Sequence, residues 1–194
     1  MALPLFCIAD EAKPFIHKIL AVNKQDEESC KTFFLVESQD FPKHNRAFKE
    51  SLKANEDFET EFVGASEQEC RNWAREHQKH GEFIEHNIVA IADSRTAKDS
   101  TISLPVYKEH DQCKFEGYGI LPPTPNAWYD WRVNAQGAAK VLIHLRYGPM
   151  ETGWPTYFAR KAELTDEDGV FDVTKADRVV CDQDTEICIY SRND

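Results

Sequence analysis

The stretch that decides the fold class is LFCIADEAKPFIHKIL, residues 5–20, which joins an apolar run to a helical pattern. Residues 5–9 are continuously apolar, as in a strand that is buried on both faces of a sheet. Asp10 follows at a position that suits a helix N-cap, and apolar side chains then return at helical spacing over residues 15–20. Pro14 lies close enough to the helix start to be tolerated. The segment predicts one β–α unit.

The same alternation continues through the first half of the chain. Residues 32–36 predict a second strand and residues 41–52 a second helix, and residues 58–63 predict a third strand. Ser66-Glu67-Gln68-Glu69 is a capping box that starts the next helix, and residues 87–92, the most apolar run, predict a fourth strand. Because right-handed crossovers join parallel strands by short connections, this order favours a mostly parallel sheet covered by helices.

The second half of the chain alternates less clearly. Four segments read as strands, at residues 102–107, 115–121, 154–164 and 186–190, and residues 138–147 fit a helix or a strand equally well. We therefore expect the α/β class, as a single three-layer domain over residues 1–194. Its sheet should be mostly parallel in the N-terminal half, with a mixed or antiparallel extension in the C-terminal third.

The negative net charge of the chain restricts which partners the protein is expected to bind. The formal net charge is −11, and the 23 Lys and Arg residues are scattered without a basic run. Such a surface repels a phosphate backbone and anionic lipid alike. No apolar run approaches the ~20 residues that cross a bilayer. We expect neither nucleic acid nor a membrane as a partner.

The N-terminus and the cysteines bear on the compartment. Residues 1–10 carry no positive charge and no small-residue cleavage site, so they predict a strand and not a signal peptide. Six cysteines lie far apart inside apolar segments, at positions 7, 30, 70, 113, 181 and 188. That placement suits reduced thiols better than a disulfide framework. A cytoplasmic protein is the expectation.

Common catalytic and cofactor motifs are missing from the sequence. The turn after the first predicted strand is Asp10-Glu11-Ala12-Lys13, and no GxGxxG, GxxxxGK[ST], GxSxG, HExxH or CxxC pattern occurs. A trio of Asp10, Asp40 and Asp93 at the strand ends suits Mg²⁺, but helix caps and a turn explain the same residues. We expect no cofactor and no metal, and whether the protein is an enzyme stays open.

An aromatic segment supplies the candidate site. Trp128 and Trp131 follow a proline block, Trp154 comes later, and Arg132 is interleaved, so these four are the candidate ligand-binding residues. Polar side chains near them or at a predicted strand end are the candidate catalytic residues: Asp93, Asp130 and His144. The alternative is that the large aromatic rings simply fill the core.

Two functions compete, and they imply different partners. The first is a small-molecule-binding protein or small enzyme that uses an aromatic-lined pocket near the carboxyl ends of the strands. The alternative is an acidic protein-interaction module, an inhibitor or neutralising partner without catalysis, that binds a basic protein. A plain scaffold or subunit role is a third option, and the sequence does not indicate the oligomeric state.

Several short segments between residues 32 and 137 carry a resemblance. They are the strand Phe33-Phe34-Leu35-Val36 with Glu37 and Asp40 after it, Glu61-Phe62-Val63, the strand end Ile91-Ala92-Asp93-Ser94-Arg95-Thr96, and Trp128 after a proline. In these features the chain resembles a group of small bacterial α/β proteins of uncharacterised function. The resemblance implies the α/β order and supplies no activity or site.

Overall fold

The computed structural model describes residues 2–24, 31–41, 48–77, 84–109 and 111–190, with only the backbone for residue 24 and residues 183–190. Within it the chain forms two compact units. Unit 1 comprises residues 1–107 and 129–136, and unit 2 comprises residues 108–128 and 137–194. The expectation of a single domain stays a prediction, and each unit is described by itself.

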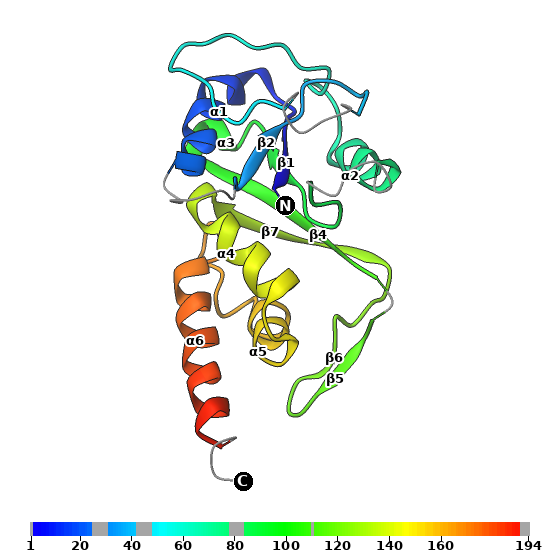
Figure 1. Cartoon of the computed structure of the whole chain (residues 1–194), viewed down its shortest axis with the longest axis vertical. Coiled ribbons are helices and arrows are strands. Elements are labelled where there is room, and N and C mark those ends of the chain that lie inside the picture. The colour runs from blue at the N-terminus through cyan, green and yellow to red at the C-terminus, as the bar shows by residue number, and fades with distance from the viewer. Residues whose placement is uncertain (1, 25–30, 42–47, 78–83, 110, 191–194) are drawn as a thin grey trace. The chain divides into compact units, whose positions relative to one another are not determined.

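A five-stranded sheet in the order β2-β1-β3-β4-β7 organises unit 1 (Figure 1). The strands are β1 (Leu3–Cys7), β2 (Phe33–Leu35), β3 (Ala90–Ala92), β4 (Thr101–Lys108) and β7 (Ala127–Asn134). β1 pairs in parallel with both β2 and β3, whereas β3 pairs antiparallel with β4. The sheet is thus mixed and parallel near the N-terminus, which confirms the α/β class. The three-layer arrangement stays a prediction.

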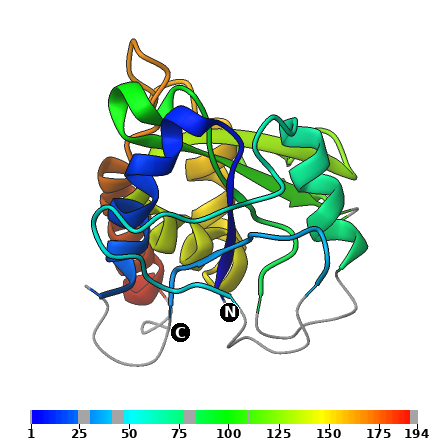
Figure 2. The same ribbon diagram turned by 90° about the horizontal axis from the view of Figure 1, so that it is seen from above.

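The first predicted β–α unit is present. Every residue of β1 is buried, and α1 (Lys13–Leu20) has Pro14 in its first turn and buries Ile16, Ile19 and Leu20. The prediction that Asp10 caps a helix was wrong. Asp10 is instead the first residue of a short 3₁₀ turn, η1 (Asp10–Ala12), and its carboxylate pairs with the Lys13 ammonium at 2.9 Å. Figure 2 shows α1 and α2 (Glu67–Glu76) on opposite sides of β1.

The second helix and the third strand were predicted wrongly where the structure describes them. Residues 48–52 are not helical, because Lys49 instead forms a bridge with Leu35 of β2; residues 42–47 of that prediction lie outside the described residues. Residues 58–63 form no strand, although Phe58 and Phe62 are buried. They run into a turn whose Gly64 N–H donates to the Ile8 carbonyl at 2.9 Å.

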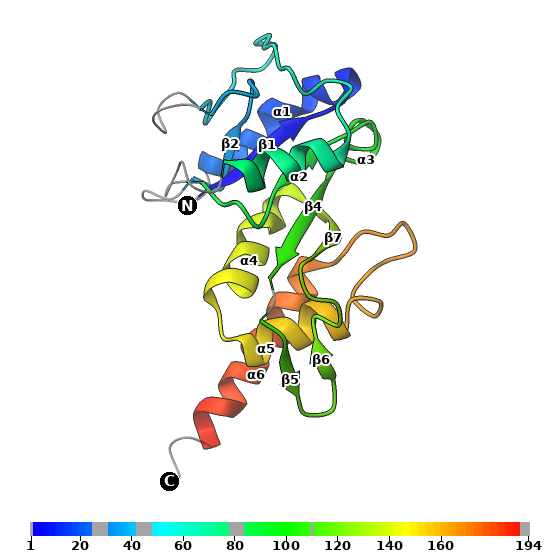
Figure 3. The same ribbon diagram turned by 90° about the vertical axis from the view of Figure 1, so that its right-hand side faces the viewer.

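Unit 2 is largely helical. It contains the hairpin β5 (Cys113–Phe115) and β6 (Gly119–Leu121), then α4 (Ala138–Leu142), the π-helix η5 (Ile143–Tyr147), α5 (Met150–Trp154), the π-helix η6 (Pro155–Ala159) and α6 (Val173–Tyr190). Figure 3 shows α6 as the long last helix before the C-terminus. The ambiguous segment 138–147 is therefore helical, and the residues predicted as a single strand over 115–121 contain the end of β5, the hairpin turn and β6.

The two last predicted strands were wrong, and so was the β extension of the C-terminal third. Residues 154–159 are helical, and Gly153 is the reason that α5 packs so closely on η5, since a Cβ there would collide with the His144 carbonyl oxygen. Residues 186–190 end α6, whose first turn is capped by the Asp172 carboxylate accepting from the Lys175 N–H at 3.0 Å. None of the described helices is long and apolar enough to cross a membrane.

Candidate functional site

The seven candidate site residues fall in both units. Unit 1 holds Asp93, Asp130, Trp131 and Arg132, and unit 2 holds Trp128, His144 and Trp154. What each group can do chemically is therefore taken unit by unit.

In unit 1, Asp93 and Arg132 bind each other. Two guanidinium N–H groups of Arg132 donate to the two carboxylate oxygens of Asp93 at 2.6 and 2.7 Å, and Arg132 also donates to the Thr101 hydroxyl at 2.6 Å. Asp93 accepts further bonds from the N–H groups of Arg95 and Thr96. Burial alone raises the pKa of Asp93, but Arg132 and Thr96 outweigh it and hold the pKa below its usual range. With both oxygens so occupied, the carboxylate is suited to fixing the turn after β3.

The other two candidates of unit 1, Asp130 and Trp131, make different contacts. Asp130 is exposed and accepts a bond from Arg71 of α2 at 2.6 Å, while Trp131, its neighbour on β7, is 1% exposed and lies in the core. The two-residue period of a strand places Trp131 on the opposite face of β7 from Asp130 and Arg132. The structure therefore brings Asp93 and Arg132 together, while Asp130 pairs with Arg71 and Trp131 packs in the core.

In unit 2, His144 belongs to a polar cluster that spans four helical segments. Its Nδ1 lies 3.0 Å from the Tyr157 hydroxyl of η6, and its Nε2 lies 3.3 Å from Oδ1 of Asp177 on α6. Lys140 of α4 pairs with the second oxygen of Asp177. Burial, and then the charge of Asp177, raise the pKa of Tyr157 above its usual range. π-helices often mark functional sites, and here two of them supply the His and the Tyr.

Trp154 is the centre of an aromatic cluster in unit 2. It is 1% exposed, with Phe115 and Phe158 packed edge-on at 6.1 and 6.2 Å and the Lys108 ammonium 3.8 Å from the ring centroid. Burial, then the charge of Arg146, lower the pKa of Lys108. Trp128 is half-buried. Because its rings and cation already contact one another, this cluster is a packed core.

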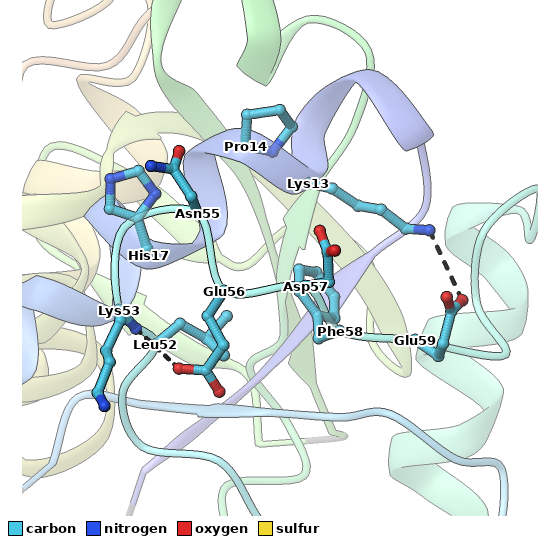
Figure 4. Close-up of a pocket in the computed structure, with 10 residues that line it drawn as sticks. All are labelled: Lys13, Pro14, His17, Leu52, Lys53, Asn55, Glu56, Asp57, Phe58 and Glu59. Carbon is cyan, nitrogen blue, oxygen red and sulfur yellow. Dashed lines mark hydrogen bonds and ion pairs between the residues drawn. The ribbon is translucent and has the colours of Figure 1, made fainter.

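The larger of two pockets described in unit 1, the α1 pocket, has a volume of about 340 Å³ (Figure 4). Lys13, Pro14 and His17 of α1 form one wall, and the loop over residues 52–59 forms the other. Figure 4 shows two contacts within its lining: the Lys13 ammonium lies 3.9 Å from a Glu59 carboxylate oxygen, and the Glu56 carboxylate accepts from the Lys53 backbone N–H at 3.0 Å.

The second pocket of unit 1, the α2 pocket, has a volume of about 220 Å³ and lies against α2. Phe62, Trp73 and His77 give it aromatic walls, and its remaining lining residues are Gln39, Ala65, Glu69, Asn72 and Glu76. The Trp73 indole N–H donates to the Gln39 carbonyl at 2.9 Å, which fixes the ring. The rings of Trp73 and His77 meet at 4.8 Å between centroids, and those of Trp73 and Phe62 at 6.4 Å.

The α2 pocket lies where parallel strands end. Gln39 follows β2, and the turn that carries Phe62 and Ala65 is tied to the end of β1 by the bond from Gly64 to Ile8. The carboxyl ends of parallel strands are the usual ligand edge of an open α/β sheet. Sequence reasoning expected an aromatic pocket at this edge but named other aromatic residues.

A sequence signal for this pocket existed in α2. Glu69, Asn72, Trp73 and Glu76 recur at intervals of three and four residues, which places them on one helical face. The capping box fixes the helix start and therefore the phase of that face. Phe62 and Gln39 carried no comparable signal, because the loops that position them have no period.

Comparisons with known proteins add no family or relative: no family model, no curated protein and no solved structure matches the chain. The resemblance to small bacterial α/β proteins stays a prediction. In the described part of the chain, no group of three His, Cys, Asp or Glu side chains is arranged to hold a metal ion.

Proposed function

We propose that the protein binds a small organic molecule in the α2 pocket. The observation that carries the proposal is the combination of aromatic walls, Phe62, Trp73 and His77, with polar groups at the carboxyl ends of β1 and β2. Ligand pockets are typically apolar clefts with a few convergent polar groups that fix orientation. The α2 pocket has this composition.

The α1 pocket supports a ligand less well, although it is larger. Its apolar lining is Pro14, Leu52 and Phe58, and its Lys13 ammonium already lies 3.9 Å from Glu59. A ligand there would have to compete with that ion pair, which offsets what its own contacts contribute. The α2 pocket is lined by Phe62, Trp73 and His77, whereas the aromatic lining of the α1 pocket is Phe58 and His17.

The test is native mass spectrometry of the gently purified chain, looking for mass beyond 22.3 kDa, followed by a thermal-shift screen of metabolites. Compounds that raise the melting temperature are then tested on Ala65→Leu, which adds bulk to the pocket lining without removing a buried contact. We expect this variant to lose most of the shift.

Ala21→Leu is the matched control, because Ala21 is exposed at the end of α1 and does not line the pocket. It should respond as the unmodified chain does. A ligand whose shift survives Ala65→Leu but not a substitution in the α1 pocket would move the site to that pocket, and a chain that binds no compound would refute the proposal.

An interaction module is the second candidate function, and one observation favours it. Among the side chains that the structure describes, the exposed large hydrophobic ones all belong to unit 2: Tyr118, Ile120, Ile143, Tyr147 and Met150. Ile143, Tyr147 and Met150 recur at intervals of four and three residues, and Ile143 and Tyr147 are 53% and 57% exposed. Contiguous exposed apolar surface often marks a protein interface.

This candidate is tested by capture from an extract of the protein's source at low salt. A stoichiometric basic partner that is lost on Tyr147→Asp, with the fold intact by circular dichroism, would support an interaction module. Recovery of the same partner by Tyr147→Asp would contradict a role for this surface.

A further inference from the structure

We propose that the α1 pocket is a second binding site, which takes a neutral, hydroxyl-rich ligand of the size of a monosaccharide. The proposal goes beyond the proposed function, because it concerns a different pocket and does not depend on a ligand in the α2 pocket. Three features of the α1 pocket carry it: the loop that forms one wall, the polar side chains that have no partner, and the apolar part of the lining.

The loop that forms one wall of the pocket is held in place at both ends and in its turn. Leu52 and Phe58 anchor it in the core and are 8% and 7% exposed. The Lys53 N–H donates to the Glu56 carboxylate at 3.0 Å, and the Glu56 N–H donates to the Lys53 carbonyl at 3.1 Å. Asn55 lies within this turn with a φ of 65°, a left-handed conformation that asparagine tolerates. The loop therefore presents its polar side chains from a fixed backbone.

Three polar side chains that line the pocket have no hydrogen bond or ion pair with another side chain or the backbone in the described part of the chain. They are His17 of α1, and Asn55 and Asp57 of the loop. In the view of Figure 4, His17 and Asn55 lie at one end of the pocket, and Lys13 and Glu59 lie at the other. A ligand at the His17 end can therefore bind free polar groups and leave the contact between Lys13 and Glu59 in place.

The free side chains include both hydrogen-bond donors and acceptors. The Asp57 carboxylate only accepts, the Asn55 amide donates and accepts, and the His17 imidazole does either, according to its tautomer. A hydroxyl group also donates and accepts, so neighbouring hydroxyls of one ligand can satisfy all three side chains. An ammonium ion only donates and leaves the Asn55 N–H groups without a partner, whereas an anion is repelled by Asp57. The polar groups therefore favour a neutral polyol.

The charges of the lining do not favour an ionic ligand. Lys13 and Lys53 face three carboxylates, those of Glu56, Asp57 and Glu59, so the positive and negative charges nearly cancel. Figure 4 shows the Lys53 side chain extending away from the other lining residues. Ion pairs between exposed groups contribute little in water. Binding of a neutral ligand should be independent of ionic strength, whereas binding of an ion should weaken as salt rises.

The apolar part of the lining suits the carbon skeleton of a sugar. It consists of Pro14, which is exposed, and of Leu52 and Phe58, which are buried. Because the Phe58 ring is covered, a planar aromatic ligand has no ring face to stack on and gains little here. The volume of about 340 Å³ lies at the lower end of the range for ligand pockets, which fits a single sugar ring.

The experiment titrates glucose, mannose and galactose in turn into the ¹⁵N-labelled full chain. It follows the side-chain amide resonance of Asn55, which is assigned by its loss in Asn55→Gly, since glycine keeps the left-handed backbone conformation. We expect at least one of the three sugars to shift this resonance with a millimolar Kd that does not change with salt. The protonated 6-amino-6-deoxy derivative of that sugar and its 6-phosphate should each bind about threefold more weakly.

Asp57→Asn is the variant, and Asp40→Asn is the matched control, because Asp40 is also exposed but does not line the pocket. Asp57→Asn should weaken binding of the sugar about tenfold, because a charged acceptor is lost, and should leave the remaining amide spectrum unchanged. Asp40→Asn should leave the affinity within experimental error.

An Asn55 resonance that none of the three sugars shifts would overturn the proposal. So would an unchanged affinity in Asp57→Asn, or equal or tighter binding of either charged derivative. A sugar that shifts the indole N–H resonance of Trp73, assigned by its loss in Trp73→Phe, but not that of Asn55 would also overturn the α1 site, while supporting the proposed function of the α2 pocket. The two sites are thus tested separately.

Discussion

Arg132 and Asp93 are 39 residues apart in the sequence and share two hydrogen bonds of 2.6 and 2.7 Å. The pair ties β7 to the turn that follows β3, in a site where the two side chains are only 11% and 21% exposed. Planar guanidinium matches a carboxylate in this bidentate geometry, and a lysine ammonium does not. The relationship gives a first prediction.

Asp93→Asn should lower the free energy of unfolding by about 2 kcal/mol, because it leaves the Arg132 charge largely buried without its counter-ion. Asparagine keeps an acceptor for the Thr96 N–H, so the turn itself is retained. Urea unfolding of Asp93→Asn, Arg132→Met and the double variant measures the coupling. Additive losses in the double variant would show that the two residues do not stabilise each other.

The same pair predicts the acid side of the stability profile. Because the pKa of Asp93 is lowered on folding, its contribution is complete above the ordinary pKa near 3.8 and is lost as the pH falls through the folded value. Below about pH 4, the unmodified chain should therefore lose more stability than Asp93→Asn does. Parallel acid profiles for the two proteins would contradict this assignment.

The capping box of α2 gives a second prediction. The Ser66 hydroxyl accepts from the Glu69 N–H at 3.3 Å, and the Glu69 carboxylate accepts from the Ser66 N–H at 2.7 Å. Ser66→Ala should cost about 1 kcal/mol of unfolding free energy in a urea titration. Ser66→Asp, which restores an acceptor at the N-cap, should recover most of the loss, and equal stabilities of all three proteins would show that the cap is dispensable.

Local signals explain which elements the sequence predicted. The capping box at Ser66 and the apolar run of β1 are each contained within a few neighbouring residues. The helix α2 and the strand β1 both form where these signals predicted them. The strand predicted over residues 58–63 does not form. The residues there favour strands by their composition, but Phe58 and Phe62 are buried from a loop instead. In residues 154–159, large apolar residues suggested a strand, but Gly153 permits close helix packing that the pattern alone does not reveal.

The candidate site was less predictable, because its pairs span the chain. Asp93 and Arg132 were both proposed from their chemistry, but their mutual bond depends on β4 and β7 being neighbours in the sheet. Neither Tyr157 nor Asp177 was predicted as a partner of His144, since the three residues come from the separate segments η6, α6 and η5. Long-range pairing of this kind leaves no periodic trace in the sequence.

Thiol reactivity gives a third prediction. Burial raises the pKa of Cys7 to about 11 and that of Cys70 to about 12, so both are protonated at pH 8 and also shielded from solvent. Of the four cysteines whose side chains the structure describes, iodoacetamide should label exposed Cys181 first and leave Cys7 and Cys70 unmodified, as peptide mass spectrometry would show. In urea, every cysteine should react. Labelling of Cys70 at the rate of Cys181 in the folded chain would contradict its burial.

A fourth prediction concerns the hydroxyl of Tyr157. Tyr157→Phe preserves the ring packing against Phe171, at 5.1 Å between centroids, but removes the group that lies 3.0 Å from the His144 Nδ1. A buried imidazole nitrogen then loses its partner, and the free energy of unfolding should fall by about 1 kcal/mol in a urea titration at pH 7. Tyr147→Phe is the control, because Tyr147 is exposed.

Alkaline titration tests the burial of the Tyr157 phenol beside Asp177. Since folding raises the pKa of Tyr157, the folded state keeps the phenol protonated, and stability is lost as the pH rises above the ordinary tyrosine pKa of 10. The unmodified chain should therefore destabilise above about pH 10 more steeply than Tyr157→Phe, whose ring cannot ionise. Identical alkaline profiles, measured by circular dichroism, would mean that Tyr157 ionises freely in the folded chain and is not enclosed with His144 and Asp177.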